Sequence, residues 1–299
     1  MFVSVSHRVL ARAGHESIAA ALADLRLAAL EVVTDRSLAL PSLDGATPPA
    51  TAGAQAAANR AYRAHLYRLS ARLSALAASW GALSSACEDD AACLTECIGA
   101  TEVLGAPVLG LAVASLDAGA RGHDSSWPLL VSCLQQGLGQ TRGSRVAIAL
   151  EFQADPLSGA GLPPALTPLF ESERVGLTLD PGALYRAGLP GPIVHDLVRE
   201  LAPLVRRVLC RNFRCAGRGA ESPDGSAADN VEPCPLEVGG IDYGHIACLL
   251  GRAGYAGALT VANAPPDDAQ PSIARRWLAA DIAFLRDLLG EAGAWGHRR

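Results

Sequence analysis

The chain has 299 residues, of which 50% are hydrophobic, and it carries a formal net charge of −5. This length allows one barrel-sized domain or two smaller ones. The net negative charge argues against a nucleic-acid partner, because proteins that bind nucleic acids usually carry a basic surface patch. All 25 basic residues are arginines, so a Schiff-base lysine, lysine-linked pyridoxal phosphate (PLP) and a P-loop are excluded.

Short apolar runs alternate with amphipathic stretches along the whole chain. The runs that predict strands are 2–5, 29–34, 74–79, 107–114, 145–151, 176–180, 207–211 and 258–262. The helical patterns are 16–27, 54–73, 89–104, 127–138, 165–171, 194–204, 243–253 and 271–289. Eight strand–helix units predict an α/β fold, a single (β/α)8 TIM barrel over residues 1–299 with parallel strands and outer helices. A doubly wound sheet is the alternative, but no GxGxxG follows the first strand.

Two segments, 41–53 and 216–235, are rich in Pro, Gly and Ser or Ala and predict flexible loops. Both follow predicted strands, on the face where barrel enzymes keep their active sites. They are therefore either lids over the site or disordered insertions, and composition favours disorder for part of each.

Nothing in the sequence points to a membrane or to an oxidising compartment. The N-terminal apolar run is too short for a signal peptide, and no uninterrupted run reaches the ~18 residues of a membrane span. The eight cysteines include no CxxC pair, which favours free thiols over a zinc site. We therefore expect a cytoplasmic protein.

The residues that end the predicted strands are the candidates for a shared pocket, because strand ends of a barrel meet at one mouth. Glu151 and Asp180 are the clearest, since each is a lone acid that closes an apolar run. A buried carboxylate at such a place needs a partner. The other candidates at or near strand ends are His7, Asp35, Trp80, Asp117, Arg211, Asn212 and Asn263.

Four segments resemble the xylose isomerase-like barrels, the superfamily of sugar phosphate isomerases and epimerases. The run 145–151 is similar to the family's fifth strand, which ends in a metal-binding Glu. VGLTLDPGALYRAG resembles its Asp-Thr-Gly-His segment. EVGGIDYGHIACLLGRAGYAGALTVAN is similar to the region around its eighth strand, and PSIARRWLAADIAFLRDLL to its closing helix. The resemblance covers nearly the whole chain and implies the same barrel.

The family site that this resemblance implies holds one divalent cation between Glu, Asp, His and Glu. Glu151 and Asp180 match the first two ligands, but Leu209 and Ala262 stand where the His and the second Glu belong. Two carboxylates alone bind such ions weakly. The resemblance therefore implies a degenerate metal site, with either no cofactor or a weakly bound Mn, Mg, Co or Zn ion.

These observations predict a sugar or polyol (phosphate) isomerase or epimerase with a remodelled site. Glu151 is the candidate general base, with Asp180 beside it, and Arg211 is a candidate replacement for the metal as the electrophile. His7, Asp35, Trp80, Arg211, Asn212 and Asn263 are candidates for contacts with a small carbohydrate-like substrate. Two alternatives remain: a non-catalytic paralogue that binds or regulates a partner, and a metal-independent lyase or cyclase. A homo-oligomer is possible, but no motif indicates one.

Overall fold

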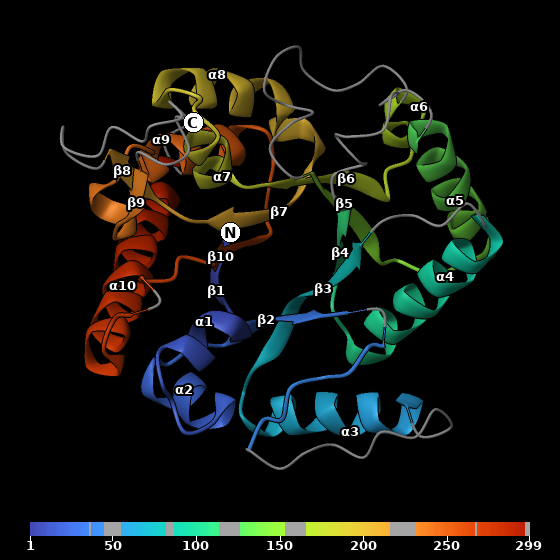
Figure 1. The fold of residues 1–299 in the computed structure, drawn as a ribbon, viewed down its shortest axis with the longest axis horizontal. Helices are drawn as coiled ribbons and strands as arrows, with labels where there is room; N and C mark the ends of the chain where they lie inside the picture. Colours follow the sequence, from blue (N-terminus) through green and yellow to red (C-terminus); the bar gives the residue numbers. More distant parts are fainter. Residues whose placement is uncertain are drawn as a thin grey trace.

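The computed structural model describes residues 1–35, 37–44, 55–81, 87–113, 126–152, 166–215, 231–266 and 268–296. Its centre is a closed barrel of parallel strands, and helices surround this barrel (Figure 1). The order of the strands around the ring is β1-β10-β7-β6-β5-β4-β3-β2. The strands are β1 (Phe2–Ser6), β2 (Ala29–Thr34), β3 (Arg72–Gly81), β4 (Val108–Val113), β5 (Ala147–Phe152), β6 (Val175–Leu179), β7 (Val205–Cys210) and β10 (Ala258–Val261). The predicted TIM barrel is confirmed.

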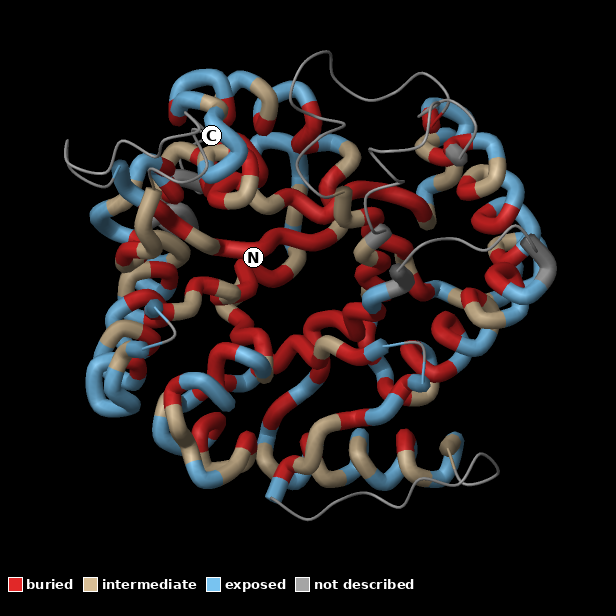
Figure 2. Tube along the Cα trace, in the orientation of Figure 1, coloured by how far each residue is buried: buried red, intermediate tan, exposed pale blue. Residues whose placement is uncertain are grey.

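The strands are largely buried on both faces because the barrel interior lies on one side of them and the helices on the other. All five residues of β6 are buried, as are all four residues of β10. In Figure 2 the buried residues follow the ring of strands and the helix faces that are turned toward it. Burial on both faces explains why the strands appear in the sequence as short runs of mostly apolar residues.

The helices are placed by amphipathic patterns and by capping residues. In α8, for example, Val194, Val198 and Leu201 recur at helical spacing and are buried. The Ser17 side chain caps α2 by accepting a hydrogen bond from the Ala20 backbone N–H. The helices are α1 (His7–Arg12), α2 (Ile18–Asp24), α3 (Gln55–Arg68), α4 (Cys87–Leu104), α5 (Ser126–Gln140), α6 (Thr167–Phe170), α7 (Pro181–Arg186), α8 (Gly191–Leu201), α9 (Tyr243–Arg252) and α10 (Pro271–Gly296).

Three local predictions are corrected by the structure. The helix predicted over 54–73 ends at Arg68, because β3 already begins at Arg72. The helix predicted over 194–204 gives way to a 3-10 turn at Ala202–Leu204, which contains Pro203. Two short helices, α1 and α7, follow β1 and β6 directly and were not predicted.

The predicted loop 216–235 is wrong in its last part. Residues Val231–Pro233 form strand β9, which pairs antiparallel with β8 (Phe213–Cys215) in a separate two-stranded sheet. Residues 216–230, and residues 45–53 of the other predicted loop, lie outside the described residues. Within the part of the chain that the structure describes, every helix is too short or too polar to cross a lipid bilayer.

Candidate functional site

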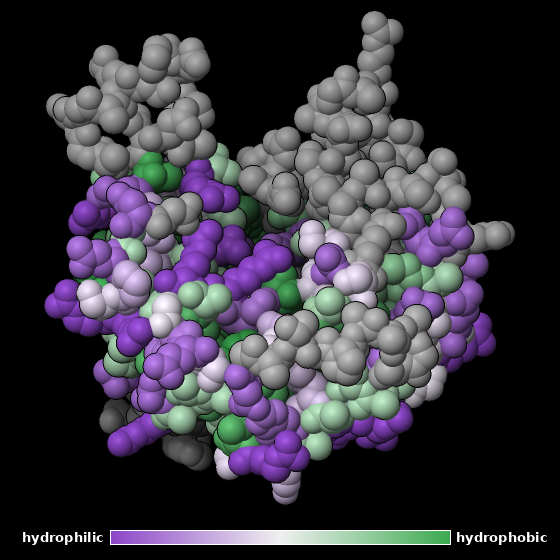
Figure 3. Space-filling model, turned by 60° about the horizontal axis from the view of Figure 1, so that its bottom comes forward, coloured by the Kyte–Doolittle hydropathy of each residue, from purple (hydrophilic) through white to green (hydrophobic). Residues whose placement is uncertain are grey.

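A pocket of about 860 Å³ opens at the carboxyl ends of the barrel strands. Residues at or just beyond the ends of several strands line it, among them Ser6, Ser79, Glu151, Asp180 and Asn263. Figure 3 shows one side of the molecule, on which hydrophilic residues gather around a hollow near the middle. The pocket therefore lies at the end of the barrel at which the sequence predicted a site.

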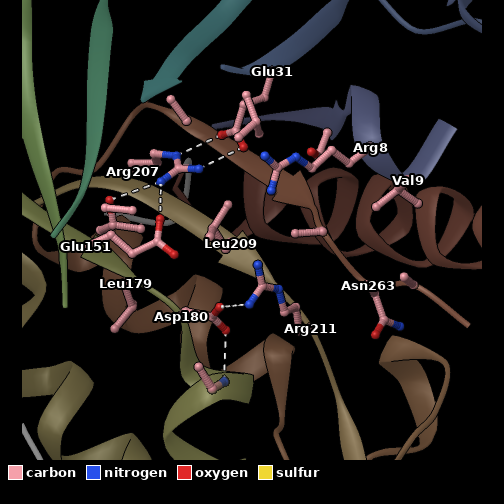
Figure 4. A pocket seen from close by; sticks show the side chains of 18 of the residues that line it. Arg8, Val9, Glu31, Glu151, Leu179, Asp180, Arg207, Leu209, Arg211 and Asn263 are labelled. Atoms are coloured by element: carbon pink, nitrogen blue, oxygen red, sulfur yellow. Dashed lines mark hydrogen bonds and ion pairs between the residues drawn. The ribbon is translucent and has the colours of Figure 1, made fainter. Parts of the chain in front are cut away.

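An arginine that the sequence analysis did not single out occupies the floor of this pocket. Arg207, on β7, donates from Nε and Nη2 to the two carboxylate oxygens of Glu31 on β2, both at 2.8 Å. Its Nη1 donates to Glu151 Oε2 on β5 at 2.7 Å. Figure 4 shows the guanidinium between the two carboxylates. One cation therefore bridges three strands across the barrel, with bidentate geometry toward Glu31.

Burial makes this bridge a strong electrostatic constraint. The side chains of Arg207 and Glu31 are only 4% and 1% exposed, whereas Glu151 is 24% exposed toward the pocket. Burial acts to lower the pKa of Arg207, but the charges of Glu31 and Glu151 outweigh it, and the net pKa is raised. Arg207 is therefore a permanent cation.

A glycine in β4 leaves room for the Arg207 guanidinium. A Cβ added at Gly110 would lie 2.9 Å from Arg207 Nη1 and 3.1 Å from its Cζ. Glycine in a strand interior often marks a close approach of this kind. This glycine in VLGLAV, together with charged residues inside the runs ALEVVT and VRRVLC, is the signal in the sequence that points to the bridge.

Asp180 has its own arginine partner. Its Oδ2 lies 2.9 Å from Arg211 Nη1, while its Oδ1 accepts a hydrogen bond from the Ala183 backbone N–H at 2.9 Å and so caps α7. Oδ2 is buried and has no hydrogen bond of good geometry. Burial raises the pKa of Asp180, although the Arg211 charge and the Ala183 N–H act in the opposite direction. Arg211 is therefore the charged partner that this buried carboxylate needs.

Of the other candidates, two lie away from the pocket lining, and two have side chains outside the described residues. His7 Nδ1 accepts a hydrogen bond from the Val33 backbone N–H at 3.1 Å. Asp35 is exposed and accepts from the Ser37 backbone N–H at 2.8 Å. Neither belongs to the lining of the pocket. Trp80 lies in β3, but its side chain is outside the described residues, as is Asp117 altogether.

The two asparagine candidates are engaged within the protein. The Asn212 side chain donates to the Leu236 and Ile241 carbonyls and accepts from the Ile241 backbone N–H. Asn263 Nδ2 donates to the Cys234 carbonyl and to Asp281 Oδ2, both at 2.8 Å. Asn263 still lines the pocket, while Asn212 does not. These contacts anchor the segment after β9 to α10.

Comparison with solved structures places the fold among the xylose isomerase-like barrels. A xylose isomerase domain protein from Planctomyces limnophilus has 15% identity and a TM-score of 0.63, over 96% of both chains. A sugar phosphate isomerase/epimerase from Parabacteroides distasonis has 9% identity and a TM-score of 0.62, over 95% of this chain and 92% of that one. A xylose isomerase-like barrel from Mycobacterium smegmatis in complex with magnesium has 17% identity and a TM-score of 0.55, over 81% and 90%.

At these identities the likeness shows the fold, and the activity has to be argued from the site. The sequence matches no protein-family model and no curated protein sequence.

The described residues that line this pocket do not fit a divalent cation. Glu151 is held by Arg207, and Asp180 lies against Arg211, so positive charges already stand beside both expected ligands. Leu209 and Ala262, the other two expected positions, line the pocket with apolar side chains. No group of three or more His, Cys, Asp or Glu side chains able to hold a metal occurs among the described residues. A metal ion here would meet repulsion from two guanidinium groups.

We expect Gly110→Ala to destabilise the protein, because the new methyl would press on a guanidinium that three hydrogen bonds hold in place. Gly99→Ala in α4 is the matched control, since an added Cβ there meets nothing within 4 Å. It should stabilise the helix by about 0.5–1 kcal/mol. Urea unfolding of both variants measures the difference, and equal effects of the two would contradict the close approach.

Arg207→Met should lower the free energy of unfolding by about 3–5 kcal/mol, because it leaves the buried Glu31 carboxylate without its partner. Adding Glu31→Gln should restore part of the loss, since it removes the stranded charge. Arg199→Met breaks only the exposed pair with Asp196 and should cost less than about 1 kcal/mol. Denaturant unfolding checks all three, and a double variant no more stable than Arg207→Met would argue against the charge bridge.

His7 should make stability fall as the pH drops below neutral. Burial, helped by the Arg8 charge, lowers the pKa of His7 from 6.5 to about 4. Between these values the unfolded chain binds a proton that the folded protein does not, so stability falls toward about 1.4 kcal/mol per pH unit as the pH decreases. His7→Asn should remove this slope relative to the wild type.

The comparison with His7→Asn cancels the opposite effect of Asp281, whose pKa burial raises to about 6. NMR titration of the His7 ring is the direct measurement. A His7 pKa near 6.5, together with equal slopes for the two proteins, would contradict this prediction.

Proposed function

We propose that this protein catalyses proton transfer on a small carbohydrate-like molecule without a metal ion, as an isomerase or epimerase in which arginines supply the positive charge. The observation that carries the proposal is the position of Glu151. Its carboxylate is fixed at 2.7 Å by the buried Arg207 and yet remains 24% exposed to the pocket. A base that is both positioned and accessible is what removal of a proton next to a carbonyl requires.

The two arginines would have different roles. Arg207 uses each of its three nitrogens to bind Glu31 and Glu151, so it acts as a positioning residue for the base. Arg211 contacts one acid and its side chain is 32% exposed, so it is the guanidinium that a substrate oxygen can reach. A cation aimed at a developing oxyanion stabilises the charge of an enediolate.

The proposed isomerisation needs only one base. Glu151 takes the proton from the carbon next to the carbonyl, and the electrons of that C–H bond form the C=C bond of an enediolate whose oxygen faces Arg211. Return of the proton to the neighbouring carbon, with a proton shift between the two oxygens, gives the isomer. Return to the opposite face of the same carbon gives the epimer and needs a second acid. Asp180, whose pKa burial raises, is the candidate for that acid.

A binding protein without catalysis is the second candidate, and one observation favours it. Glu151 and Asp180 already have arginine partners, at 2.7 and 2.9 Å. A carboxylate oxygen that is occupied in this way has to give up part of that pairing to accept a proton. The two candidates therefore differ in whether Glu151 exchanges protons with a bound molecule.

The experiment is an exchange assay in D₂O. The protein is incubated with a panel of aldoses, ketoses, their phosphates and sugar acids, with EDTA present, and NMR detects deuterium at carbon and the formation of isomers. We expect exchange with at least one compound in EDTA, no stimulation by Mn, Mg, Co or Zn, and a loss of ~10² or more in rate for Glu151→Gln. Asp180→Asn should affect epimer formation more than isomer formation. Arg199→Gln, which changes an exposed side chain outside the pocket lining, is the control.

Three outcomes would overturn the proposal. Exchange that depends on added metal would contradict the role of the arginines. Exchange that Glu151→Gln retains would contradict the assigned base. A compound that raises the melting temperature and shows no exchange would establish the binding protein instead.

A further inference from the structure

The charge of the pocket is opposite to that of the whole chain. The formal net charge of the protein is −5, but arginines outnumber acids among the described residues that line the pocket. The lining arginines are Arg8, Arg12, Arg186, Arg207 and Arg211, and the lining acids are Glu31, Glu151 and Asp180. An acidic protein that gathers basic side chains around one cavity creates a local field that attracts anions.

The acids of the pocket are already matched by two of these arginines. Arg207 pairs with Glu31 and Glu151, and Arg211 lies against Asp180. Arg8 and Arg186 form no ion pair with any of the described residues, although the Arg186 guanidinium lies 5.5 Å from the centre of the Phe213 ring. Positive charge is therefore left over at the rim, where a ligand can use it.

Arg8 and Arg186, which have no ion pair among the described residues, and Arg211 follow separate strands. Arg8 is in the first turn of α1, directly after β1, and Arg186 ends α7, which follows β6. Arg211 follows β7. In Figure 4, Arg8 and Arg211 extend their guanidinium groups toward the same part of the pocket. This arrangement allows planar donors to approach one ligand group from different sides.

We propose that Arg8, Arg186 and Arg211 form a subsite for an oxyanion group, phosphate or carboxylate, at the mouth of the barrel. Guanidinium groups bind both of these groups through paired N–H donors. The inference rests on the proposed function for the carbohydrate-like remainder of the ligand and adds that this ligand carries an acidic group. The subsite would bind that group, while Glu151 lies at the floor of the pocket.

The Asp180 carboxylate sets the orientation of this subsite. Its Oδ2 is buried, without a hydrogen bond of good geometry, and its ion pair leaves the other Arg211 nitrogens free of described hydrogen-bond acceptors. Asp180 therefore fixes one edge of Arg211 and leaves the rest of its donors for a ligand. Arg8 differs from Arg211 in that its side chain is exposed and has no ion pair among the described residues, so an incoming anion can contact it.

The test uses the full chain and two simple probes, inorganic phosphate and glycolate. Each is titrated by calorimetry and by melting temperature against sodium chloride of equal ionic strength. We expect saturable binding of at least one probe, and a loss of ~10-fold or more in affinity for Arg8→Gln and for Arg186→Gln. Arg199→Gln, which removes an exposed arginine outside the pocket lining, should leave binding unchanged.

The two probes also distinguish the possible sources of the oxyanion. Tighter binding of phosphate points to a phosphorylated ligand, and tighter binding of glycolate points to a sugar acid. Binding no stronger than that of chloride, or affinity unchanged in both Arg8→Gln and Arg186→Gln, would overturn the subsite. Both variants change exposed side chains, so their melting temperatures without probe should match the wild type.

Failure of this inference can be separated from failure of the proposed function. Deuterium exchange on uncharged sugars, with no oxyanion binding, would overturn the subsite alone. Oxyanion binding that depends on the two arginines, with no exchange on any compound, would support the subsite and overturn the catalytic proposal.

Discussion

The rest of the pocket depends on the bridge that Arg207 makes between Glu31 and Glu151. Arg207 and Glu31 are far apart around the ring, on β7 and β2, so their bidentate pair spans the barrel interior. A buried charge of this kind lowers the stability of the fold unless it is fully paired, and three short hydrogen bonds to carboxylates pair Arg207. Gly110 on the facing strand β4 leaves room for the guanidinium. The bridge thus decides where Glu151 lies and which residue types the floor of the pocket can hold.

The same bridge balances the charge of the pocket acids, although Leu209 and Ala262 stand where the resemblance implies two metal ligands. Clustered carboxylates repel each other and need a cation nearby. In this chain Arg207 and Arg211 supply positive charge from within the protein, while Leu209 and Ala262 make the remaining wall apolar. A guanidinium differs from a metal ion in that it donates hydrogen bonds of fixed direction and cannot be removed by a chelator. The positive charges that offset the pocket carboxylates therefore come from the protein's own arginines.

The sequence was sufficient to predict the barrel, because buried parallel strands and amphipathic helices leave clear patterns. It also identified Glu151, Asp180 and Arg211, which close apolar runs and line the pocket. It did not identify Glu31 or Arg207, because each lies inside a run that otherwise indicates a buried strand. Asp35 follows the same run that contains Glu31, but β2 ends at Thr34 and the Asp35 side chain is exposed. Whether a strand residue points inward depends on register across the barrel, which one sequence does not specify.

The division of donors between the two pocket arginines limits which of them can act on a ligand. Every nitrogen of Arg207 donates to a carboxylate, and Nη1 also lies 3.4 Å from Thr178 Oγ1. Little of its hydrogen-bonding capacity remains, so its effect on a bound molecule acts through charge and through the position of Glu151. Arg211 is committed to a single acid and is partly exposed. In the proposed reaction, a ligand oxygen that develops negative charge would therefore find its donor in Arg211 at the rim, while Glu151, the proposed base, lies at the floor. The proposed reaction therefore requires a substrate that lies with its reacting carbon toward Glu151 and its charged oxygens toward Arg211.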